Sequence, residues 1–447
     1  MATFYVENFG CRATQADGAA IERQLAEKGW RRRGDPRLVD VVVVNTCTVT
    51  SAADHDARAA IRRIHRQNPE CRILVTGCYA QRAPQEVGSL PGVSWVVGNS
   101  HKHQIGEIAL RAPGGNGQGF VPLGSLDGTG TVQVVGDIFA HTELLAAPVF
   151  EGDAAGERTR PNLKVQDGCD NRCSFCIIPS VRGQSRSLPQ DEVLREMDAL
   201  VAAGYREVVI SGINLGRWGR DFERPQTFAG LVRAVVEKTG IERLRISSVE
   251  PMDWTDELIE LVASSPRIAK HAHVPLQSGS DRILRLMHRK YRPWHYAARV
   301  RKIRKAMPTA AIGADVMVGF PGETDADFED NRRFIESLPF TYLHVFTYSS
   351  RPGTPSARMA EQVEVAVRRE RNRELRGLAA AKKRAFLEGF VGSTLSGITL
   401  NVREGEYTES LTDNYLKLML RGRHGANQMV TARAESVQGE ALLGSVC

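Results

Sequence analysis

The chain has 447 residues, of which 42% are hydrophobic and 25% charged, with a formal net charge of +7 and eight cysteines. No apolar run is long enough to cross a bilayer and the first residues show no signal peptide, so we expect a soluble, cytoplasmic protein of two or three domains. The positive charge favours a polyanionic partner. Eight cysteines in such a chain favour metal binding or catalysis over a disulfide framework.

The first hundred residues alternate between strand and helix patterns. Strands are expected over residues 3–10, 38–46 and 71–77, and helices over residues 16–30 and 51–67. Strands that alternate with helices in this order predict a parallel, doubly wound sheet with helices on its faces. This region would form the first domain, residues 1–111.

A second series of strands and helices follows a glycine-rich segment that has the composition of a linker. Such a series predicts a partial or complete (β/α) barrel, with its chemistry at the carboxyl ends of the strands. A basic helix over 361–386 then leads to short β-rich pieces that predict a small β-barrel. The expected α/β protein therefore comprises domain 1–111, linker 112–160, barrel domain 161–383 and C-terminal β-barrel 384–447.

Three cysteines with the spacing C-x3-C-x2-C open the second domain, in the stretch "GCDNRCSFC". Cys169, Cys173 and Cys176 follow a strand-like segment and fall in a loop. A structural zinc site needs four ligands and ferredoxin motifs supply a fourth cysteine nearby, so neither pattern fits. A 4Fe-4S cluster held by three thiolates would leave one iron able to bind a small molecule.

"CDNRCSFC", with Phe175 between the last two cysteines, resembles the signature of radical S-adenosylmethionine (SAM) enzymes. The resemblance implies that the open iron is chelated by SAM, whose reductive cleavage gives a 5′-deoxyadenosyl radical that abstracts hydrogen. Glycine-rich and polar strand ends suit a nucleoside pocket, although ordinary turn glycines would look the same. The SAM-contact candidates are Phe175, Gly212, Asn214, Ser248, Glu250 and Gln277.

Three further cysteines share one position, the carboxyl end of an expected parallel strand. Cys11, Cys47 and Cys78 close "YVENFGC", "VVVVNTC" and "ILVTGC", whereas Cys71 opens a strand and Cys447 is terminal. One buried cysteine alone is best interpreted as a small core residue. Three at the same edge of one sheet converge in space. They predict a second iron–sulfur cluster with one open iron.

Both cysteine sets, together with "NTCTVT", "VTGCYAQ", "RISSVEP", "VPLQSGSDRILRLMHRKY" and "DVMVGFPGE", resemble the radical-SAM methylthiotransferases over nearly the whole chain. The resemblance implies an amino-terminal cluster domain, a radical-SAM barrel and a carboxyl-terminal TRAM barrel. Thr14 and Leu188 depart from the family pattern, and neither is expected to touch a cluster ligand. "VNTCTVT" and "RGQSRS" look most like the type that acts on N6-threonylcarbamoyladenosine-37 of tRNA. Isopentenyladenosine-37 of tRNA and an aspartate of a ribosomal protein are the other substrates in the family.

The resemblance also implies a reaction and its partners. Hydrogen is abstracted from C2 of the adenine, sulfur is inserted from the second cluster, and a second SAM supplies the methyl group. A tRNA anticodon stem-loop and an electron donor of the flavodoxin or ferredoxin type are the expected partners. The basic helix could contact phosphates, and so could Arg421, Arg423 and His424 in the small barrel. Tyr415 could stack on a base. The alternative from another class is a non-enzymatic iron–sulfur protein that binds RNA.

Overall fold

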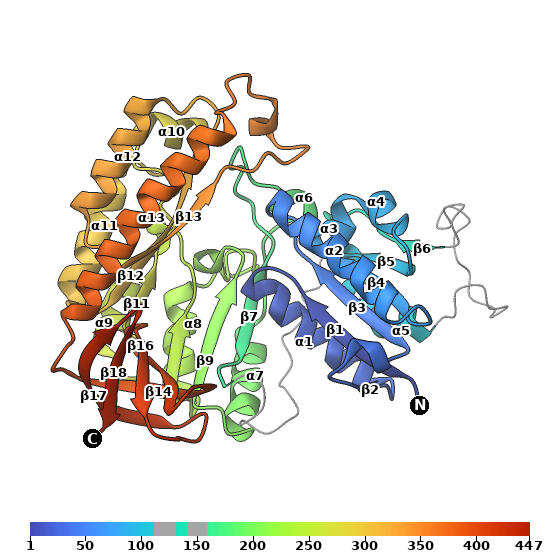
Figure 1. The fold of residues 1–447 in the computed structure, drawn as a ribbon, viewed down its shortest axis with the longest axis horizontal. Helices are drawn as coiled ribbons and strands as arrows, with labels where there is room; N and C mark the ends of the chain where they lie inside the picture. The colour runs from blue at the N-terminus through green and yellow to red at the C-terminus, as the bar shows by residue number, and fades with distance from the viewer. Residues whose placement is uncertain (111–130, 141–158) are drawn as a thin grey trace. The chain divides into compact units, whose positions relative to one another are not determined.

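The computed structural model describes residues 1–110, 131–140 and 159–447, and these form two compact units (Figure 1). Unit 1 comprises the described residues within Met1–Phe150, Gln166–Ser187 and Ser349–Thr354. Unit 2 comprises those within Glu151–Val165, Leu188–Tyr348 and Pro355–Cys447. Most of the expected linker, residues 112–160, lies outside the described residues. Within its described part, β6 (Val132–Val134) pairs in parallel with a strand of unit 1.

Unit 1 is built on a parallel sheet with the strand order β2-β1-β3-β4-β5-β6. The expected parallel sheet is confirmed, and α2 spans the same residues as the sequence pattern. Besides β6, the α-helices and β-strands of this unit are β1 (Thr3–Asn8), α1 (Arg12–Glu27), β2 (Arg31–Arg32), β3 (Val41–Thr46), α2 (Ser51–Gln67), β4 (Arg72–Gly77), α3 (Cys78–Arg82), α4 (Pro84–Gly88), β5 (Val93–Gly98), α5 (Ile105–Leu110), α6 (Ile178–Arg182) and β8 (Arg186–Ser187).

Both faces of this sheet are apolar, because the central strands are buried on both sides. In β3, Val42 and Val44 pack on one face with Ile61 of α2, while α3 and α4 add to the same layer. Val41 and Val43 pack on the opposite face, with Ile21 of α1 and residues of α5. Helices therefore cover both faces and leave the carboxyl edge of the strands for the loops.

Unit 2 contains a partial (β/α) barrel. β10 pairs in parallel with β9, β11 with β12 and β12 with β13, and bridges at Leu244–Ile268 and Ser248–His273 connect β10 to β11. The elements are β7 (Asn162–Asp167, which ends in unit 1), α7 (Gln190–Ala202), β9 (Glu207–Gly212), α8 (Phe228–Lys238), β10 (Arg243–Ile246), α9 (Asp256–Ser264), β11 (His271–His273), α10 (Asp281–Leu286), α11 (Pro293–Ala306), β12 (Ala311–Val318), α12 (Asp325–Ser337), β13 (Tyr342–Thr347) and α13 (Val365–Glu388).

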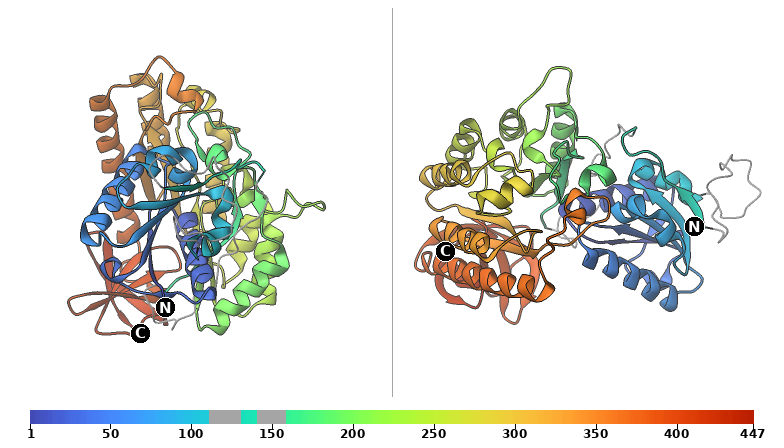
Figure 2. Two further views of the ribbon diagram at one scale, coloured as in Figure 1. Left: turned by 90° about the vertical axis from the view of Figure 1, so that its right-hand side faces the viewer. Right: turned by 90° about the horizontal axis from the view of Figure 1, so that it is seen from above.

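The C-terminal strands close into the barrel β14-β15-β16-β18-β17, as expected (Figures 1 and 2). One of its contacts with the larger barrel is polar and buried: Arg245 of β10 donates to the carbonyl oxygen of Thr412 at 2.9 Å, and Glu207 of β9 accepts from the same guanidinium at 2.8 Å. The small barrel is therefore held to the larger one by a buried guanidinium. Its strands are β14 (Thr394–Glu404), β15 (Tyr407–Thr412), β16 (Lys417–Arg421), β17 (Met429–Gln438) and β18 (Ala441–Val446).

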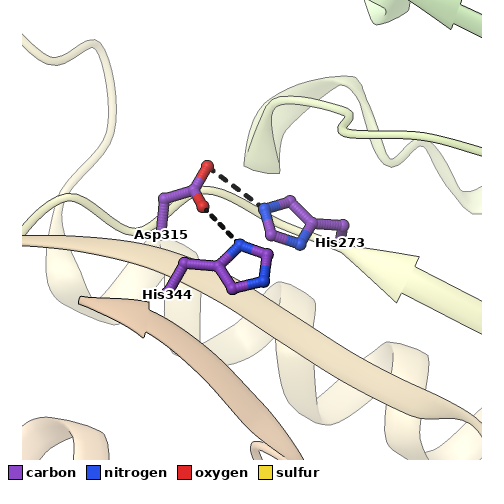
Figure 3. A group of neighbouring side chains, drawn as sticks. All are labelled: His273, Asp315 and His344. Carbon is purple, nitrogen blue, oxygen red and sulfur yellow. Dashed lines mark hydrogen bonds and ion pairs between the residues drawn. The ribbon is translucent and has the colours of Figure 1, made fainter. Parts of the chain in front are cut away.

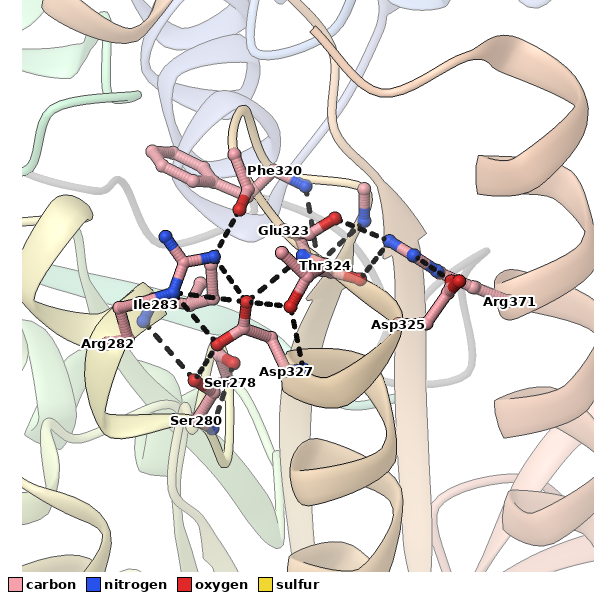
Figure 4. A network of polar contacts seen from close by, with 12 residues as sticks. Ser278, Ser280, Arg282, Ile283, Phe320, Glu323, Thr324, Asp325, Asp327 and Arg371 are labelled. Carbon is pink, nitrogen blue, oxygen red and sulfur yellow. Dashed lines mark hydrogen bonds and ion pairs between the residues drawn. The ribbon is translucent and has the colours of Figure 1, made fainter. Parts of the chain in front are cut away.

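The glycine-rich segment after β12 is held by a network of ion pairs and hydrogen bonds (Figure 4). Asp327 accepts from Ser280 Oγ at 2.8 Å, from Thr324 Oγ1 at 2.6 Å and from Arg282. Glu323 accepts from the backbone N–H of Gly319 at 2.8 Å and from Arg371 of α13 at 2.9 Å. The loops that follow β11 and β12 are thereby tied to each other and to α13.

Candidate functional site

Strand register places the first cysteine set at one edge of the unit 1 sheet. Asn8 at the end of β1 pairs with Asn45 of β3, and Thr46 of β3 pairs with Gly77 of β4. Cys47 and Cys78 come directly after β3 and β4, and Cys11 follows β1 by three residues. The expected convergence of these strand ends is confirmed, whereas Cys71 precedes β4 at the opposite edge.

Two glycines and an asparagine allow these loops to approach closely. A Cβ atom at Gly10 would lie 2.4 Å from Cβ and 2.9 Å from Sγ of Cys47, and one at Gly77 would lie 2.3 Å from the carbonyl oxygen of Thr46. Both glycines also have positive φ angles, which other residues rarely adopt. Asn45 donates to the carbonyl oxygen of Thr14 at 2.8 Å. The loop that carries Cys11 is thereby fastened to β3.

A buried ion-pair group secures the loop that carries Cys47. Thr48 donates to Asp54 Oδ1 at 2.6 Å, and Asp54 also accepts from Arg82 at 2.9 Å and from Arg351. Arg82 ends the short helix that begins at Cys78, so one carboxylate links two of the cysteine loops. These contacts hold the thiols of Cys47 and Cys78 in a defined arrangement.

The second cysteine set lies in the loop between β7 and α6, also within unit 1. The backbone N–H of Cys169 donates to the carbonyl oxygen of Gly183 at 3.1 Å, and that of Cys176 donates to Cys173 at 3.1 Å. A Cβ atom at Gly168 would lie 1.8 Å from the carbonyl oxygen of Gln184, so only glycine allows the chain to close here. The loop is compact because its two ends are tied together.

The two cysteine sets are connected through α6. Cys78 forms a small buried cluster with Ile177 and Val181, and Ile177 directly follows Cys176. Asn99 donates from Nδ2 to the carbonyl oxygen of Val181 at 2.7 Å and to Sγ of Cys78 at 3.5 Å. A cysteine of one set therefore packs against the residue that follows a cysteine of the other.

Arg182, at the end of α6, is a buried cation that joins the two loops. It donates to Asp167 Oδ1 at 2.9 Å and to Asp17 Oδ2 of α1 at 3.0 Å. Burial lowers the pKa of Arg182, but Asp167, Cys78 and Asp17 raise it by more, so its pKa lies well above the ordinary value. The guanidinium stays charged and keeps positive potential beside the thiols.

The donor set of Cys11, Cys47 and Cys78 fits a cationic cluster. Burial, followed by the charges of Cys78 and Cys11, raises the pKa of the Cys47 thiol to about 12. Cys47 and Cys78 are buried and Cys11 is exposed. Three ionised thiols close together need a compensating positive charge, which iron supplies when bound. The soft sulfur ligands suit iron–sulfur chemistry rather than a hard cation.

One expectation about this set is wrong. Thr14 was expected to touch no cluster ligand, but its Oγ1 lies 3.6 Å from Sγ of Cys11. Thr14 lies three residues after Cys11 in the first turn of α1, and it is buried. Residues three apart on a helix lie on the same face, which is the physical reason for the contact.

Of the SAM-contact candidates, Ser248, Glu250 and Gln277 lie after strands of the partial barrel in unit 2. Ser248 bridges to His273, and Glu250 accepts from Arg289. Gln277 has φ 67 and pairs with Val316 of β12. A left-handed backbone in a residue other than glycine costs free energy and clusters at functional sites. Gly212 ends β9, Asn214 precedes a short 3-10 helix, and Phe175 lies in the cysteine loop of unit 1.

The residues considered for RNA contact differ in how many contacts they already make within the protein. Tyr415 stacks on His271 with ring centroids 4.3 Å apart, and the guanidinium of Arg245 lies over the Tyr415 ring, 5.5 Å from its centroid. Arg371 of the basic helix is buried in the network around Glu323. Arg421 and Arg423 are exposed on the C-terminal barrel. The exposed arginines are therefore better placed to meet phosphates than Arg371.

Sequence reasoning missed Arg182, Asp17 and Asn99. "RGQSRS" contains Arg182, but nothing in that motif shows a partner on α1. Asn99 follows β5, whose end lies beside that of β4, so the strand-end argument that found Cys78 could have found it.

Comparisons with known proteins agree with this geometry. Residues 163–335 match the Radical SAM superfamily, and residues 3–98 match the Uncharacterized protein family UPF0004. Threonylcarbamoyladenosine tRNA methylthiotransferase MtaB of Bacillus subtilis (strain 168) is 38% identical over 430 residues, which cover 94% of this chain and 91% of that protein. The chain belongs to the radical-SAM methylthiotransferase family. Membership of the radical SAM superfamily implies SAM and a 4Fe-4S cluster as cofactors.

One further relative and one solved structure are also similar to this methylthiotransferase. The tRNA-2-methylthio-N(6)-dimethylallyladenosine synthase of Thermobifida fusca (strain YX) is 35% identical over 408 residues, 90% of this chain and 78% of that protein. The radical S-adenosylmethionine methyltransferase TsrM of Kitasatospora setae aligns with a TM-score of 0.57 over 77% of this chain and 72% of that one, at 15% identity, which supports the fold. None of the described helices is long and apolar enough to cross a membrane.

Proposed function

We propose that this methylthiotransferase converts N6-threonylcarbamoyladenosine at position 37 of tRNA to its 2-methylthio derivative. The observation that carries the proposal is the gathering of both three-cysteine sets in unit 1, with Cys78 packed against Ile177 and Val181. In the proposed reaction one cluster generates the radical that activates the carbon and the other supplies the sulfur, so both must lie close to one substrate. The substrate follows the name of the Bacillus subtilis relative.

Each cysteine set has its own role in this proposal. Cys169, Cys173 and Cys176 hold the cluster that binds SAM, and Cys11, Cys47 and Cys78 hold a second 4Fe-4S cluster. When bound, these groups supply the one-electron chemistry, the sulfur and the methyl group. The chain's own residues bind and orient: Arg182 keeps positive charge beside the thiols, and Asn99 fixes Cys78 against α6.

SAM is held in part by strand-end residues of the barrel in this proposal. The left-handed backbone of Gln277 and the ion pair between Glu250 and Arg289 are the features that support it. Glu250 and Arg289 can meet the ammonium and carboxylate groups of an amino acid, respectively. Phe175, Gly212, Asn214 and Ser248 complete the proposed contact set.

The tRNA anticodon stem-loop is the proposed macromolecular partner. The net charge of +7 and the exposed Arg421 and Arg423 support a polyanion. A flavodoxin- or ferredoxin-type electron donor and a cytoplasmic location belong to the same proposal. So does the domain assignment, with a cluster domain 1–111, a linker 112–160, a radical-SAM domain 161–383 and a TRAM domain 384–447.

The test uses anaerobically reconstituted protein with dithionite, SAM and two purified tRNAs. One tRNA carries threonylcarbamoyladenosine at position 37 and the other carries isopentenyladenosine. Nucleoside mass spectrometry should show the methylthio product on the first, together with 5′-deoxyadenosine. Product on the isopentenyl tRNA alone would assign the activity named for the Thermobifida fusca relative instead. A lack of 5′-deoxyadenosine would leave an iron–sulfur protein that binds RNA without modifying it.

A further inference from the structure

The partial barrel of unit 2 carries a polar group of side chains that no step above uses. We name it the inner-face cluster, and it consists of His273 on β11, Asp315 on β12 and His344 on β13 (Figure 3). His273 Nε2 lies 3.1 Å from Asp315 Oδ2, and His344 Nδ1 lies 3.2 Å from Asp315 Oδ1. Asp315 pairs directly with His344 in the strand register, so neighbouring strands present these side chains on one face.

The cluster faces the inside of the barrel. Ala314 and Val316, which alternate with Asp315, are fully buried on the other face of β12. Helices cover that other face: Tyr296 of α11 donates to the carbonyl oxygen of Val274, and Asn372 of α13 donates to that of Val345. Inner positions of (β/α) barrels are usually filled by branched aliphatic side chains. Convergent polar groups at such positions are typical of a binding site.

Tyr342 fixes the base of the cluster. Its hydroxyl lies 2.7 Å from Nε2 of His271 and 2.9 Å from Nδ1 of His273. A Cβ atom at Gly313 would lie 1.9 Å from Cζ of Tyr342, so the glycine makes room for this ring. With Nδ1 bonded to Tyr342, His273 directs Nε2 toward Asp315. The imidazole is positioned before any ligand arrives.

Exposure of the cluster rises from one side to the other. The side chain of His273 is 10% exposed, that of Asp315 28% and that of His344 52%. Phe346, two residues after His344 on the same face of β13, is also exposed. Burial by itself would raise the pKa of Asp315, but hydrogen bonds from His273 and His344 lower it well below its usual range. An ionised carboxylate, a half-exposed imidazole and an exposed aromatic ring thus lie on one face of the neighbouring strands β12 and β13.

We infer that the inner-face cluster binds the amino-acid arm on N6 of the substrate adenosine, with His344 donating to the arm's carboxylate and Asp315 accepting from its hydroxyl or N–H groups. This inference rests on the proposed function. Because Nδ1 of His344 is bonded to Asp315, Nε2 is the atom it offers, and an imidazolium between two carboxylates donates to both. Phe346 can pack against the planar base.

The same geometry makes the cluster a determinant of substrate specificity. An isopentenyl arm is apolar and offers no partner to Asp315 or His344. Binding it would bury Nε2 of His344 and the remaining acceptor positions of Asp315 without a new hydrogen bond, and sites built for a polar substrate reject such analogues strongly. The threonylcarbamoyl arm supplies a carboxylate, a hydroxyl and N–H groups. The cluster therefore selects the polar arm.

The test compares His344→Phe and the milder His344→Gln with the wild type. The matched control is His295→Phe, an exposed histidine on α11 at the outside of the barrel. The substrates are three anticodon stem-loops that differ only at position 37, which carries threonylcarbamoyladenosine, its neutral methyl amide or isopentenyladenosine. KM and kcat for the methylthio product, 5′-deoxyadenosine formed without RNA, and metal content are measured for each protein.

Wild type and His295→Phe should prefer the carboxylate over the amide. Both His344 variants should raise KM for the carboxylate substrate about 10- to 100-fold and lose that preference, with 5′-deoxyadenosine and iron unchanged. A wild-type KM and an unchanged preference for the carboxylate in both variants would overturn this inference and leave the proposed function standing. One equivalent of a divalent metal that disappears in both variants would assign the cluster to a cation and also overturn it. Wild type that forms no product from threonylcarbamoyladenosine would contradict the proposed function and the inference together.

Discussion

Unit 1 and unit 2 differ in the residue types that they gather. Unit 1 holds seven of the eight cysteines, and buried ion pairs such as Arg182 with Asp17 hold their loops. The cysteine of unit 2 is the terminal Cys447, but its partial barrel directs the inner-face cluster inward. The proposals above assign metal binding to unit 1 and recognition of the substrate arm to unit 2, so mutations should alter the two separately. Changes in unit 1 should affect iron and chemistry, and changes in unit 2 should affect substrate choice and stability.

The largest effect is expected from Cys47→Ala in unit 1. Loss of this thiolate should remove the second cluster, so methylthio product should fall more than about 1000-fold while 5′-deoxyadenosine formation persists. Cys71→Ala is the matched control, because Cys71 is equally buried but lies at the opposite end of β4. Nucleoside mass spectrometry and iron analysis provide the measurement. Full activity in Cys47→Ala would remove this residue from the ligand set.

Arg182→Met should destabilise unit 1 strongly. It leaves Asp17 and Asp167 buried without their guanidinium partner, although Lys102 still lies 2.9 Å from Asp17. Loss of one partner from a buried ion pair costs about 3–5 kcal/mol in the free energy of unfolding. Urea unfolding should show this loss, together with weaker iron retention. Arg62→Met, at an exposed position on α2, should change stability by less than about 0.5 kcal/mol. Equal behaviour of the two variants would contradict the role of Arg182.

Arg245→Met tests how unit 2 holds its C-terminal barrel. The change removes the hydrogen bonds to the carbonyl oxygens of Thr412 and Asp413 and leaves Glu207 with Arg160 at 3.5 Å and Arg243 at 3.6 Å. We expect a loss of about 2–4 kcal/mol and earlier proteolysis at the barrel, with iron content unchanged. A loss of iron equal to that of Arg182→Met would break the separation between the two units.

The smallest effect is expected from Asp327→Asn. Burial alone would raise the pKa of Asp327, but hydrogen bonds from Arg282 and Thr324 lower it well below its usual range. A lowered folded-state pKa stabilises the protein above the unfolded pKa of about 4, and this contribution is lost as pH falls through the folded value. Asp327→Asn should therefore cost about 1–3 kcal/mol at pH 7 and less at pH 3.5. Exposed Asp330→Asn on the same helix is the control, and a cost independent of pH would contradict this reason.

The sequence predicted those features whose cause is local or follows from strand order. Cys169, Cys173 and Cys176 are close in the chain, and Cys11, Cys47 and Cys78 follow strands whose order made their convergence predictable. Arg182 was missed because its partner Asp17 is 165 residues away on another element.

The inner-face cluster was missed for a related reason. A second series of strands was expected after the linker, but the side of each strand that faces inward depends on how helices pack against the sheet. Thr14 was misjudged because it was compared with a family pattern rather than placed on the first turn of α1, where it meets Cys11.

The most direct test of two clusters in unit 1 is the iron content of anaerobically reconstituted protein. Wild type should bind about eight irons per chain, and replacing all three of Cys11, Cys47 and Cys78 with alanine should leave about four. The corresponding triple variant of Cys169, Cys173 and Cys176 should also retain about four. About four irons in the wild type, with all six thiols intact, would contradict the account.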